Sequence, residues 1–341
     1  MKLQQESISQ LAELLATPRR VLIIGHTNPD GDAMGSTLAL RGVLQSRGHV
    51  AQTLVPNRFP YFLSWMEGSA ETLIYRLEAE RCKEAIAAAE VIFCLDFNST
   101  SRLEQMSEAL AENISAKRVL IDHHLSPERE AFDIVFSHPE ESSTCFVLYT
   151  ILEALYGTNA IDRSTAELIY LGMMTDTGNF SFGRLSPELF RALATLAECG
   201  IDIPKIKNHI YNSYTEDRAR LFGYVINRKM ESLQDGTVAM LSLTESELRR
   251  FRFQQGDSEG FVNYPLTIGK MKISALFIEQ RKFIRVSLRS RGEVDVNEFS
   301  RRYFSGGGHK NAAGGKSFAT MEQTLAKFRS AIAEFTAEGK L

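Results

Sequence analysis

Residues 21–32 read Val21-Leu22-Ile23-Ile24-Gly25-His26-Thr27-Asn28-Pro29-Asp30-Gly31-Asp32. The apolar, mostly β-branched start is typical of a buried strand. The turn dipeptides that follow predict a sharp bend, which would gather three possible metal ligands, His26, Asp30 and Asp32. Residues 33–45 then return to helical spacing. A strand, a polar turn and a helix in this order often form the active site of an α/β sheet, although such a turn can also simply cap the helix.

Two further apolar runs end in the same kinds of side chain. Residues 91–95 are followed by Asp96, and residues 118–121 are followed by Asp122-His123-His124. A helix expected over residues 164–174 leads into Asp176. Nearly all-apolar strands that alternate with helices predict a parallel sheet covered on both faces. The carboxyl ends of parallel strands share one edge, so we expect these polar side chains to converge.

A set of this composition indicates bound cations. Many carboxylates in one place repel each other unless positive charge neutralises them. A mixed His and Asp set without thiolates suits Mn²⁺, or Mg²⁺ with fewer nitrogen ligands. About seven ligands exceed the need of one ion, whereas two ions about 4 Å apart could share a carboxylate and hydrolyse phosphoesters. The alternatives are local: Asp96 as a helix cap, and His123-His124 as a structural pair.

Length and composition set broad limits. The 341 residues suffice for two domains, and 44% hydrophobic with 24% charged residues is ordinary for a soluble globular protein. No apolar run approaches membrane-spanning length and the start lacks the apolar segment of a signal peptide, so we expect a cytoplasmic protein. Four scattered cysteines without a CxxC pair predict buried or half-buried thiols rather than a zinc site or disulfides.

Charge is distributed unevenly along the chain. The net charge of −3 disfavours a binder of long nucleic acid. Residues 238–341 carry 17 Lys and Arg against 11 Asp and Glu, a net +6, and the remainder carries 22 against 31, a net −9. The composition changes near residues 231–236, which predicts domains at 1–233 and 234–341. The acidic part could hold cations and the basic part an anionic substrate, unless the asymmetry is chance.

The C-terminal part has two features suited to anions. Three glycines, Gly306, Gly307 and Gly308, would let a loop turn its backbone N–H groups toward a ligand, with His309 as a further donor. A mobile glycine hinge is the alternative. Arg285 and Arg289 share one face of an expected strand, where an arginine can clamp a phosphate. For Arg285 we prefer a solvated strand edge.

Together these motifs resemble a known superfamily. Four of them resemble the four motifs of the DHH phosphoesterase superfamily: His26-Thr-Asn-Pro-Asp30-Gly-Asp32-Ala-Met-Gly-Ser36, Asp96, Asp122-His123-His124 and Thr175-Asp176-Thr177-Gly178. The tail Gly306-Gly307-Gly308-His309-Lys310-Asn311-Ala312-Ala313-Gly314 resembles the DHHA1 substrate-binding domain. The whole chain is most similar to the bacterial oligoribonuclease/pAp-phosphatase (nanoRNase) subfamily.

The resemblance implies a fold and assigns roles to residues. It implies an N-terminal parallel-sheet DHH domain with a helical connector, then a smaller α/β DHHA1 domain, with the active site in the cleft between them. His26 and Asp30 would hold one metal ion, Asp32, His123 and Asp176 the other, and Asp96 would bridge them. The catalytic residues would be His124, facing the substrate, and Asp122, fixing a histidine tautomer. The substrate-binding residues would be Arg289, Gly306, Gly307, Gly308 and His309.

The implied activity is hydrolysis of very short RNA to mononucleotides and of 3′-phosphoadenosine 5′-phosphate (pAp) to AMP, with two divalent ions, Mn²⁺ first. The implied partners are these substrates, without membrane or long duplex nucleic acid, and the chain could form a homodimer. The alternatives are a phosphodiesterase for cyclic or linear dinucleotides and a nucleotide-binding regulator without turnover. A pyrophosphatase is disfavoured by the glycine-rich motif, and a processive exonuclease by the lack of room for further binding domains.

Overall fold

The computed structural model describes residues 3–341 and divides between Ser213 and Tyr214 into two compact units. The first unit contains a sheet with the order β3-β2-β1-β4-β5-β6, in which every neighbouring pair is parallel. Its strands are β1 (Arg20–Ile24), β2 (Val50–Val55), β3 (Leu73–Ile74), β4 (Val91–Leu95), β5 (Lys117–Asp122) and β6 (Ile134–Ser137). The strand order reverses between β1 and β4, the position where sheets of this kind place their ligands.

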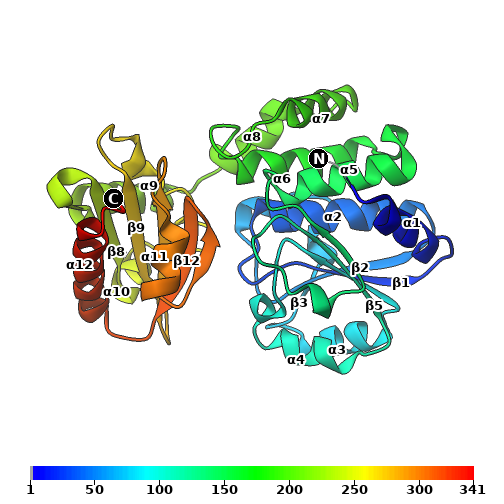
Figure 1. The fold of residues 1–341 in the computed structure, drawn as a ribbon, viewed down its shortest axis with the longest axis horizontal. Helices are drawn as coiled ribbons and strands as arrows, with labels where there is room; N and C mark the ends of the chain where they lie inside the picture. Colours follow the sequence, from blue (N-terminus) through cyan, green and yellow to red (C-terminus); the bar gives the residue numbers. More distant parts are fainter. Residues whose placement is uncertain (1–2) are drawn as a thin grey trace. The chain divides into compact units, whose positions relative to one another are not determined.

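Helices cover both faces of this sheet (Figure 1). The α2 face also carries α5 and α6 and, farther out, α7 and α8, while α3 and α4 cover the opposite face. These helices are α1 (Gln5–Leu14), α2 (Gly31–Ser46), α3 (Ala79–Ala88), α4 (Met106–Glu112), α5 (Thr144–Tyr156), α6 (Arg163–Asp176), α7 (Pro187–Glu198) and α8 (Ile203–Tyr211). Strand side chains alternate between two cores, with Ile23 in one and Leu22 in the other. The expected doubly covered parallel sheet is therefore confirmed.

The segment between Asp96 and β5 forms two short helices instead of one long helix. The structure has a 3₁₀ helix, Thr100–Leu103, followed by the shorter α4. Between them Glu104 adopts a left-handed backbone conformation, with φ of 51°, which a continuous helix does not allow. Strands β3 and β6 were not expected from the sequence, and they have only two and four residues.

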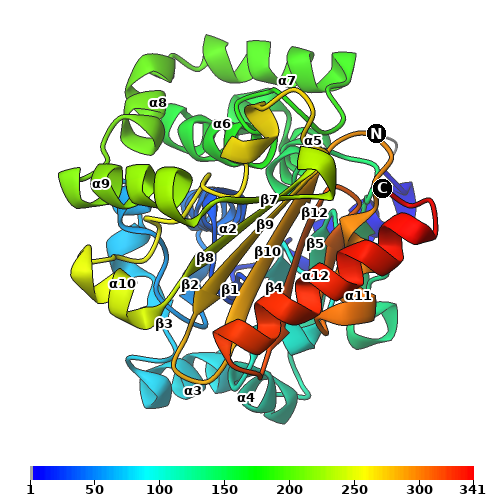
Figure 2. The ribbon, with the colours of Figure 1, turned by 90° about the vertical axis from the view of Figure 1, so that its left-hand side faces the viewer.

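The second unit is a smaller α/β domain, as expected (Figure 2). Its sheet has the order β11-β12-β10-β9-β8-β7, in which β8 and β9 are parallel and the other pairs antiparallel. The strands are β7 (Glu231–Leu233), β8 (Val238–Leu243), β9 (Ile273–Glu279), β10 (Ile284–Ser290), β11 (Gly307–His309) and β12 (Ala312–Ser317). Helices α11 (Val296–Tyr303) and α12 (Met321–Ala337) pack on one face, and α9 (Glu216–Tyr224) and α10 (Glu245–Arg250) on the other.

The helical connector packs with the second unit. Helix α9 continues into a π-helical segment, Val225–Lys229, and the two bury Leu221 and Val225 against Leu241 of β8. The structural division therefore lies before this connector, whereas the sequence predicts a boundary after it. The functional domain limits, 1–233 and 234–341, stay a prediction.

Two local expectations for the second unit are wrong. The glycine motif is not an open loop, because Gly307–His309 forms β11 and pairs with β12. At Gly306 even a Cβ would overlap the carbonyl oxygen of Gly314, so the pairing itself needs a glycine there. Arg285 is not on a solvated edge: β10 is paired on both sides, and the half-buried Arg285 donates from Nη2 to Ser258 Oγ at 2.8 Å.

Two further expectations can be compared with the structure. None of the helices within residues 3–341 is both long and apolar enough to cross a bilayer. All four cysteines are free thiols; Cys82, Cys94 and Cys145 are buried and Cys199 is half-buried, which confirms the interpretation as packed thiols.

Candidate metal centre

The loop after β1 carries the first candidate ligand. His26 is buried, with 5% of its surface exposed, and its Nδ1 donates to the carbonyl oxygen of Thr27 at 2.8 Å. The other ring nitrogen, Nε2, therefore faces Asp96, 3.3 Å from Oδ2. Burial, aided by the nearby Arg102 charge, lowers the pKa of His26 to about 4. The imidazole is neutral at neutral pH, with an Nε2 lone pair available to a cation.

The sharp turn in this loop is held by a pair of asparagines. Asn28 adopts the left-handed conformation, with φ of 56°. Its backbone N–H donates to Asn57 Oδ1 at 2.7 Å, and Asn57 Nδ2 donates back to Asn28 Oδ1 at 3.0 Å. Asn57 lies just after β2, so two adjacent strand ends fix the turn. These contacts set the direction in which His26 and Asp30 project.

Asp30 begins α2 and caps it. Its Oδ1 accepts from the backbone N–H groups of Asp32 and Ala33 at 3.0 and 3.1 Å. The expected capping role is therefore real, but it uses one carboxylate oxygen and leaves Oδ2 for another partner. Asp30 is exposed, and His26, Asp30 and Asp96 place one possible ligand atom each within 4.8 Å of one another. Capping and metal binding are compatible at this residue.

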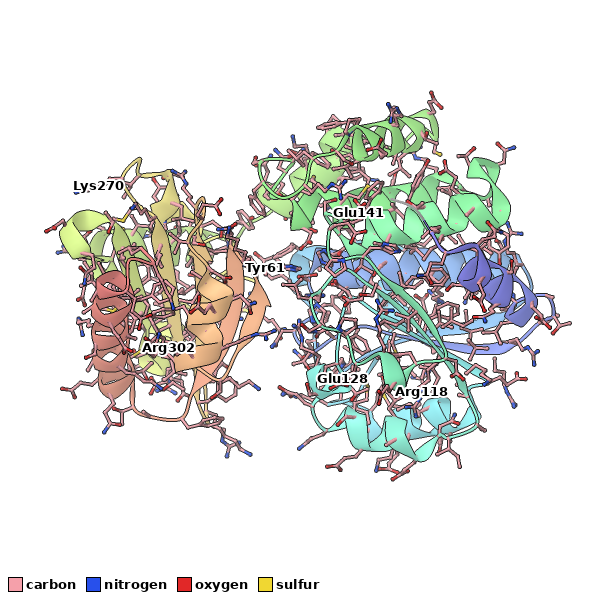
Figure 3. The ribbon with its side chains drawn as sticks, in the orientation of Figure 1. Tyr61, Arg118, Glu128, Glu141, Lys270 and Arg302 are labelled. Atoms are coloured by element: carbon pink, nitrogen blue, oxygen red, sulfur yellow. The ribbon has the colours of Figure 1, made fainter. Side chains whose placement is uncertain are left out.

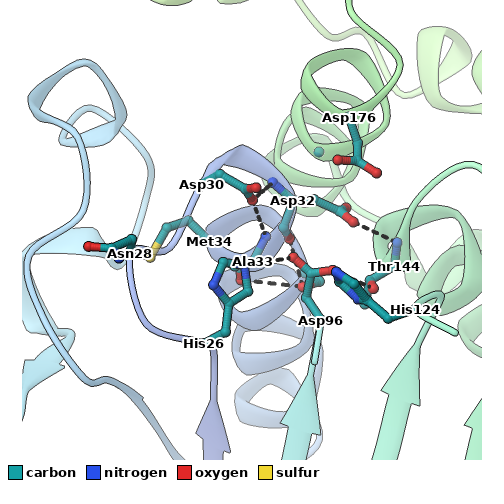
Figure 4. Close-up of polar contacts among 12 residues, drawn as sticks. His26, Asn28, Asp30, Asp32, Ala33, Met34, Asp96, His124, Thr144 and Asp176 are labelled. Carbon is teal, nitrogen blue, oxygen red and sulfur yellow. Dashed lines mark hydrogen bonds and ion pairs between the residues drawn. The ribbon is translucent and has the colours of Figure 1, made fainter. Parts of the chain in front are cut away.

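Asp32 lies in the first turn of α2 and is 1% exposed. Backbone N–H groups at the start of α5 donate to both of its oxygens: Thr144 to Oδ2 at 2.6 Å and Cys145 to Oδ1 at 2.9 Å (Figure 4). Burial, together with the Asp176 carboxylate, nevertheless raises the pKa of Asp32 to about 7. The two N–H groups hold the Asp32 carboxylate in place, but they do not neutralise its charge.

Asp96 is at the centre of the group. It follows β4 directly, is 2% exposed, and has a left-handed φ of 65°, which aspartate tolerates better than most residues. Its Oδ2 faces His26, while its Oδ1 accepts a hydrogen bond from Thr144 Oγ1 at 2.9 Å. Burial and the neighbouring carboxylates, Asp32 first, raise its pKa well above the usual range. Figure 4 shows the group gathered beyond the strand ends.

His123 follows β5 and approaches Asp96 from the other side. Its Nδ1 donates to the carbonyl oxygen of Glu141 at 3.3 Å. Glu141 lies in the loop before α5 and is labelled in Figure 3. Its Nε2 lies 3.3 Å from Asp176 Oδ2, 3.6 Å from Asp96 Oδ1 and 3.9 Å from Asp32 Oδ2. As at His26, a backbone carbonyl holds one ring nitrogen and the other points at carboxylates.

His124 is paired with Asp122. His124 Nδ1 donates to Asp122 Oδ1 at 2.6 Å, so the carboxylate at the end of β5 orients this ring, as the sequence analysis expected of Asp122. Burial lowers the pKa of His124, and the bond to Asp122 opposes that shift. Burial would raise the pKa of Asp122, but the contacts with His124 outweigh it and hold that pKa below its usual value.

Asp176 comes from a helix rather than a strand. It ends α6, and its side chain is 27% exposed. Helix α6 approaches the start of α2 closely: a Cβ at Gly31 would overlap the Thr175 side chain. This close approach carries Asp176 to within ion-pair distance of His123, so all six predicted metal ligands lie at one edge of the first sheet.

The donor set fits metal ions. Asp96 belongs both to the group with His26 and Asp30 and to a second group with Asp32 and His123, in which possible ligand atoms lie within 4.8 Å of one another. Nε2 lone pairs beside carboxylate oxygens repel unless a cation or proton lies between them. The buried Cys145 offers no thiolate, because burial raises the pKa of its thiol well above the usual value. The set is therefore oxygen and imidazole nitrogen.

Two residues near the centre were missed from the sequence. Thr144 was not recognised, because its partners Asp32 and Asp96 are 112 and 48 residues away in the chain. Arg102 was not considered, yet its carbonyl oxygen accepts a hydrogen bond from Thr27 N–H at 3.0 Å. Burial is the largest cause of the lowered pKa of His26, and the charge of Arg102 lowers that pKa further. In the sequence, Arg102 is a single basic residue in the polar segment after Asp96, and this was the only signal available for it.

The predicted substrate-binding residues all lie in the second unit. Arg289 is half-buried on β10, where its Nη1 donates to the carbonyl of Leu288 at 3.0 Å. Gly306 precedes β11, which contains Gly307, Gly308 and His309. The pairing of β11 with β12 and of β12 with β10 joins these residues in one sheet. Their role in substrate binding stays a prediction.

The chain matches two family models in the expected order. Residues 20–173 match the N-terminal domain of the DHH family, and residues 235–338 match the DHHA1 domain. The first match contains five of the six predicted metal ligands and ends just before Asp176. The second contains every predicted substrate-binding residue.

Named relatives span nearly the whole chain. The bifunctional oligoribonuclease and PAP phosphatase NrnA of Mycoplasma genitalium is 26% identical over 313 residues, covering 92% of this chain and 93% of that protein. The Bacillus subtilis protein of the same name is 25% identical and covers 90% and 92%. Among solved structures, an exopolyphosphatase-related protein from Bacteroides fragilis is 38% identical, with a TM-score of 0.91 and 97% coverage of both chains.

Proposed function

Because this chain belongs to the DHH family of phosphoesterases, with a DHH domain followed by a DHHA1 domain, we propose that it hydrolyses very short RNA to mononucleotides and pAp to AMP. The observation that carries the proposal is the arrangement of imidazole Nε2 atoms and carboxylates around Asp96. The substrate class rests on the oligoribonuclease and PAP phosphatase relatives, which match most of the chain.

Two divalent ions fit this arrangement. His26 and Asp30 would hold one, Asp32, His123 and Asp176 the other, and Asp96, with its two oxygens facing opposite sides, would contact both. Such ions polarise the phosphoryl group and activate water. The two imidazoles favour Mn²⁺ over Mg²⁺, which prefers an all-oxygen set. The backbone bonds to Thr27 and Glu141 hold both rings with Nε2 directed inward before any ion binds.

His124 and Asp122 would act on the substrate. The Nδ1–H of His124 is committed to Asp122, so Nε2 is the nitrogen that can exchange a proton with the substrate. Asp122 is 0% exposed, and its carboxylate favours the imidazolium form once a phosphate is bound nearby. That form would bind the phosphate and can give its proton to the leaving ester oxygen, which then departs as a hydroxyl.

The second unit would supply the anion donors. Arg289 and His309 offer donors for a phosphate, and the glycines of β11 let a ligand approach the backbone closely. Residues 238–341 carry a net charge of +6, whereas the rest of the chain carries −9. Metal binding and substrate capture would thus be divided between the two units.

A side-by-side assay tests the substrate class. The purified protein with Mn²⁺ is offered pAp, a ribodinucleotide, a long RNA, cyclic di-AMP and pyrophosphate. We expect AMP and phosphate from pAp, mononucleotides from the dinucleotide, and little product from the long RNA. Hydrolysis confined to cyclic di-AMP or to pyrophosphate would contradict the proposal. Binding of nucleotide without any product would indicate the regulator instead.

A further inference from the structure

The first turn of α5 contacts two candidate metal ligands that come from different elements. Its residue Thr144 donates its backbone N–H to Asp32 Oδ2 at 2.6 Å and its hydroxyl to Asp96 Oδ1 at 2.9 Å. Cys145 N–H adds a bond to Asp32 Oδ1 at 2.9 Å. Asp32 lies in the first turn of α2 and Asp96 follows β4, so a single residue of α5 joins carboxylates from two different elements.

The Thr144 hydroxyl is not needed to form the helix. Capping of α5 is done by Ser143, whose Oγ accepts from Phe146 N–H at 3.1 Å. Within residues 3–341, Asp96 Oδ1 is the partner found for Thr144 Oγ1, unlike the Thr150 hydroxyl of the same helix, which donates to the carbonyl of Phe146. Thr144 is also fully buried, so water does not compete for this bond. The hydroxyl of Thr144 therefore orients the Asp96 carboxylate and is not needed to cap α5.

The bond restricts how Asp96 can bind. With a proton of Thr144 on Oδ1, the Asp96 side chain is held in the rotamer that directs Oδ2 to His26 and leaves the second lone pair of Oδ1 toward His123. Without it, the carboxylate could rotate and offer both oxygens to one side. Ligands held in advance by hydrogen bonds bind metal more tightly.

We propose that Thr144 is a positioning residue for the metal centre, fixing the two oxygens of Asp96 on opposite sides and setting its separation from Asp32. This inference rests on the proposed two-ion function, and it adds that α5 holds the carboxylate that both ions would share. Thr144 acts through Asp96 and Asp32 and does not itself contact substrate.

The test measures Mn²⁺ binding to the metal-free protein by calorimetry, without substrate. Thr144→Val keeps the shape and removes the hydroxyl, and we expect about a tenfold to hundredfold loss of Mn²⁺ affinity. The matched control is Thr37→Val, because Thr37 is equally buried but its hydroxyl donates to the carbonyl of Ala33 within α2. The control should bind Mn²⁺ like the wild type.

If Thr144→Val disturbs folding, a second pair of variants tests the role of the Thr144 hydroxyl separately. Thr144→Ser should bind Mn²⁺ nearly as the wild type does, while Thr144→Ala should lose as much affinity as Thr144→Val. Wild-type affinity in the Val or Ala variant, or equal losses in the Ser and Ala variants, would overturn the role of the hydroxyl. Because no substrate is used, a wild-type protein that binds Mn²⁺ but does not hydrolyse pAp would refute the proposed function and leave this inference standing.

Discussion

The two sheets of this protein place their polar residues in different ways. In the parallel first sheet, His26, Asp96 and Asp122 lie at the ends of three adjacent strands and therefore meet at one edge. In the second sheet β9 and β10 are antiparallel, so Glu279 at the end of β9 pairs with Ile284 at the start of β10. Residues that follow successive strands then lie at opposite edges. Chain order alone can thus reveal a site in the first sheet but not in the second.

The carboxylates of the two units also differ in how their charge is satisfied. Burial raises the pKa of Asp32 to about 7, although two N–H groups donate to it. Burial also acts on Glu247 of the second unit, but bonds from Thr244, Tyr224 and Lys229 outweigh it and lower that pKa to about 2. The second unit supplies its own partners for its acid. In the first unit the pKa values of Asp32 and Asp96 stay raised, which supports the proposed cations.

The largest effect is expected from Asp96→Ala. Removing a ligand that two ions share should cost several kcal/mol of transition-state stabilisation, roughly a thousandfold or more in kcat. The protein should stay folded and lose bound Mn²⁺, as measured by circular dichroism, metal analysis and pAp hydrolysis. Asp133→Ala is the control, because Asp133 pairs with Lys117 at the opposite edge of the same sheet. Near-normal hydrolysis by Asp96→Ala would contradict the dinuclear assignment.

A smaller loss of activity, without loss of bound metal, is expected from substitutions in the second unit. His309→Ala and Arg289→Ala each remove a donor to the substrate, and a charge-assisted bond is worth roughly 1.5–3 kcal/mol, or about tenfold to a hundredfold in kcat/KM. Metal content should match the wild type, and an aryl phosphoester should be affected less than pAp. Arg329→Ala, which breaks an exposed pair with Glu231, is the control. Loss of bound metal in His309→Ala would show that the division of roles between the units is wrong.

The smallest effect concerns pH. An ion can bind Asp32 only after its proton leaves, and in the metal-free protein that pKa is raised to about 7. Mn²⁺ affinity should therefore fall as pH falls, by about tenfold between about pH 8 and pH 6, while His26, with a pKa of about 4, stays neutral. Calorimetry at several pH values measures this slope. An affinity that is flat over this range would show that Asp32 is already ionised without metal.

His26, Asp96 and Asp122 could be located from the sequence because their positions follow from strand ends. Strands with three or more consecutive apolar residues, such as β1, β4 and β5, are recognised easily, and the polar residue that follows must lie at the common edge. Sequence reasoning failed for β11 and β12, where Gly307, Gly308 and Gly314 carry no side chains from which a strand pattern could be recognised.

Thr144 illustrates a second limit. Its contacts are with Asp32 and Asp96, which are 112 and 48 residues away in the chain, so no local pattern indicates its role. The left-handed turn at Glu104, which divides an otherwise helical segment, had no signal of its own either. Local pattern predicts which elements form. Contacts between elements decide how a ligand is held.

The central claim is that the first unit holds two ions around Asp96, and equilibrium titration of the metal-free protein with Mn²⁺ tests it most directly. The wild type should bind two Mn²⁺ per chain, recover pAp hydrolysis as the second ion binds, and lose it again with a chelator. Asp133→Ala should behave in the same way, and Asp96→Ala should retain neither ion at the same Mn²⁺ concentration. A single bound ion at full activity, or undiminished hydrolysis after exhaustive chelation, would contradict the account.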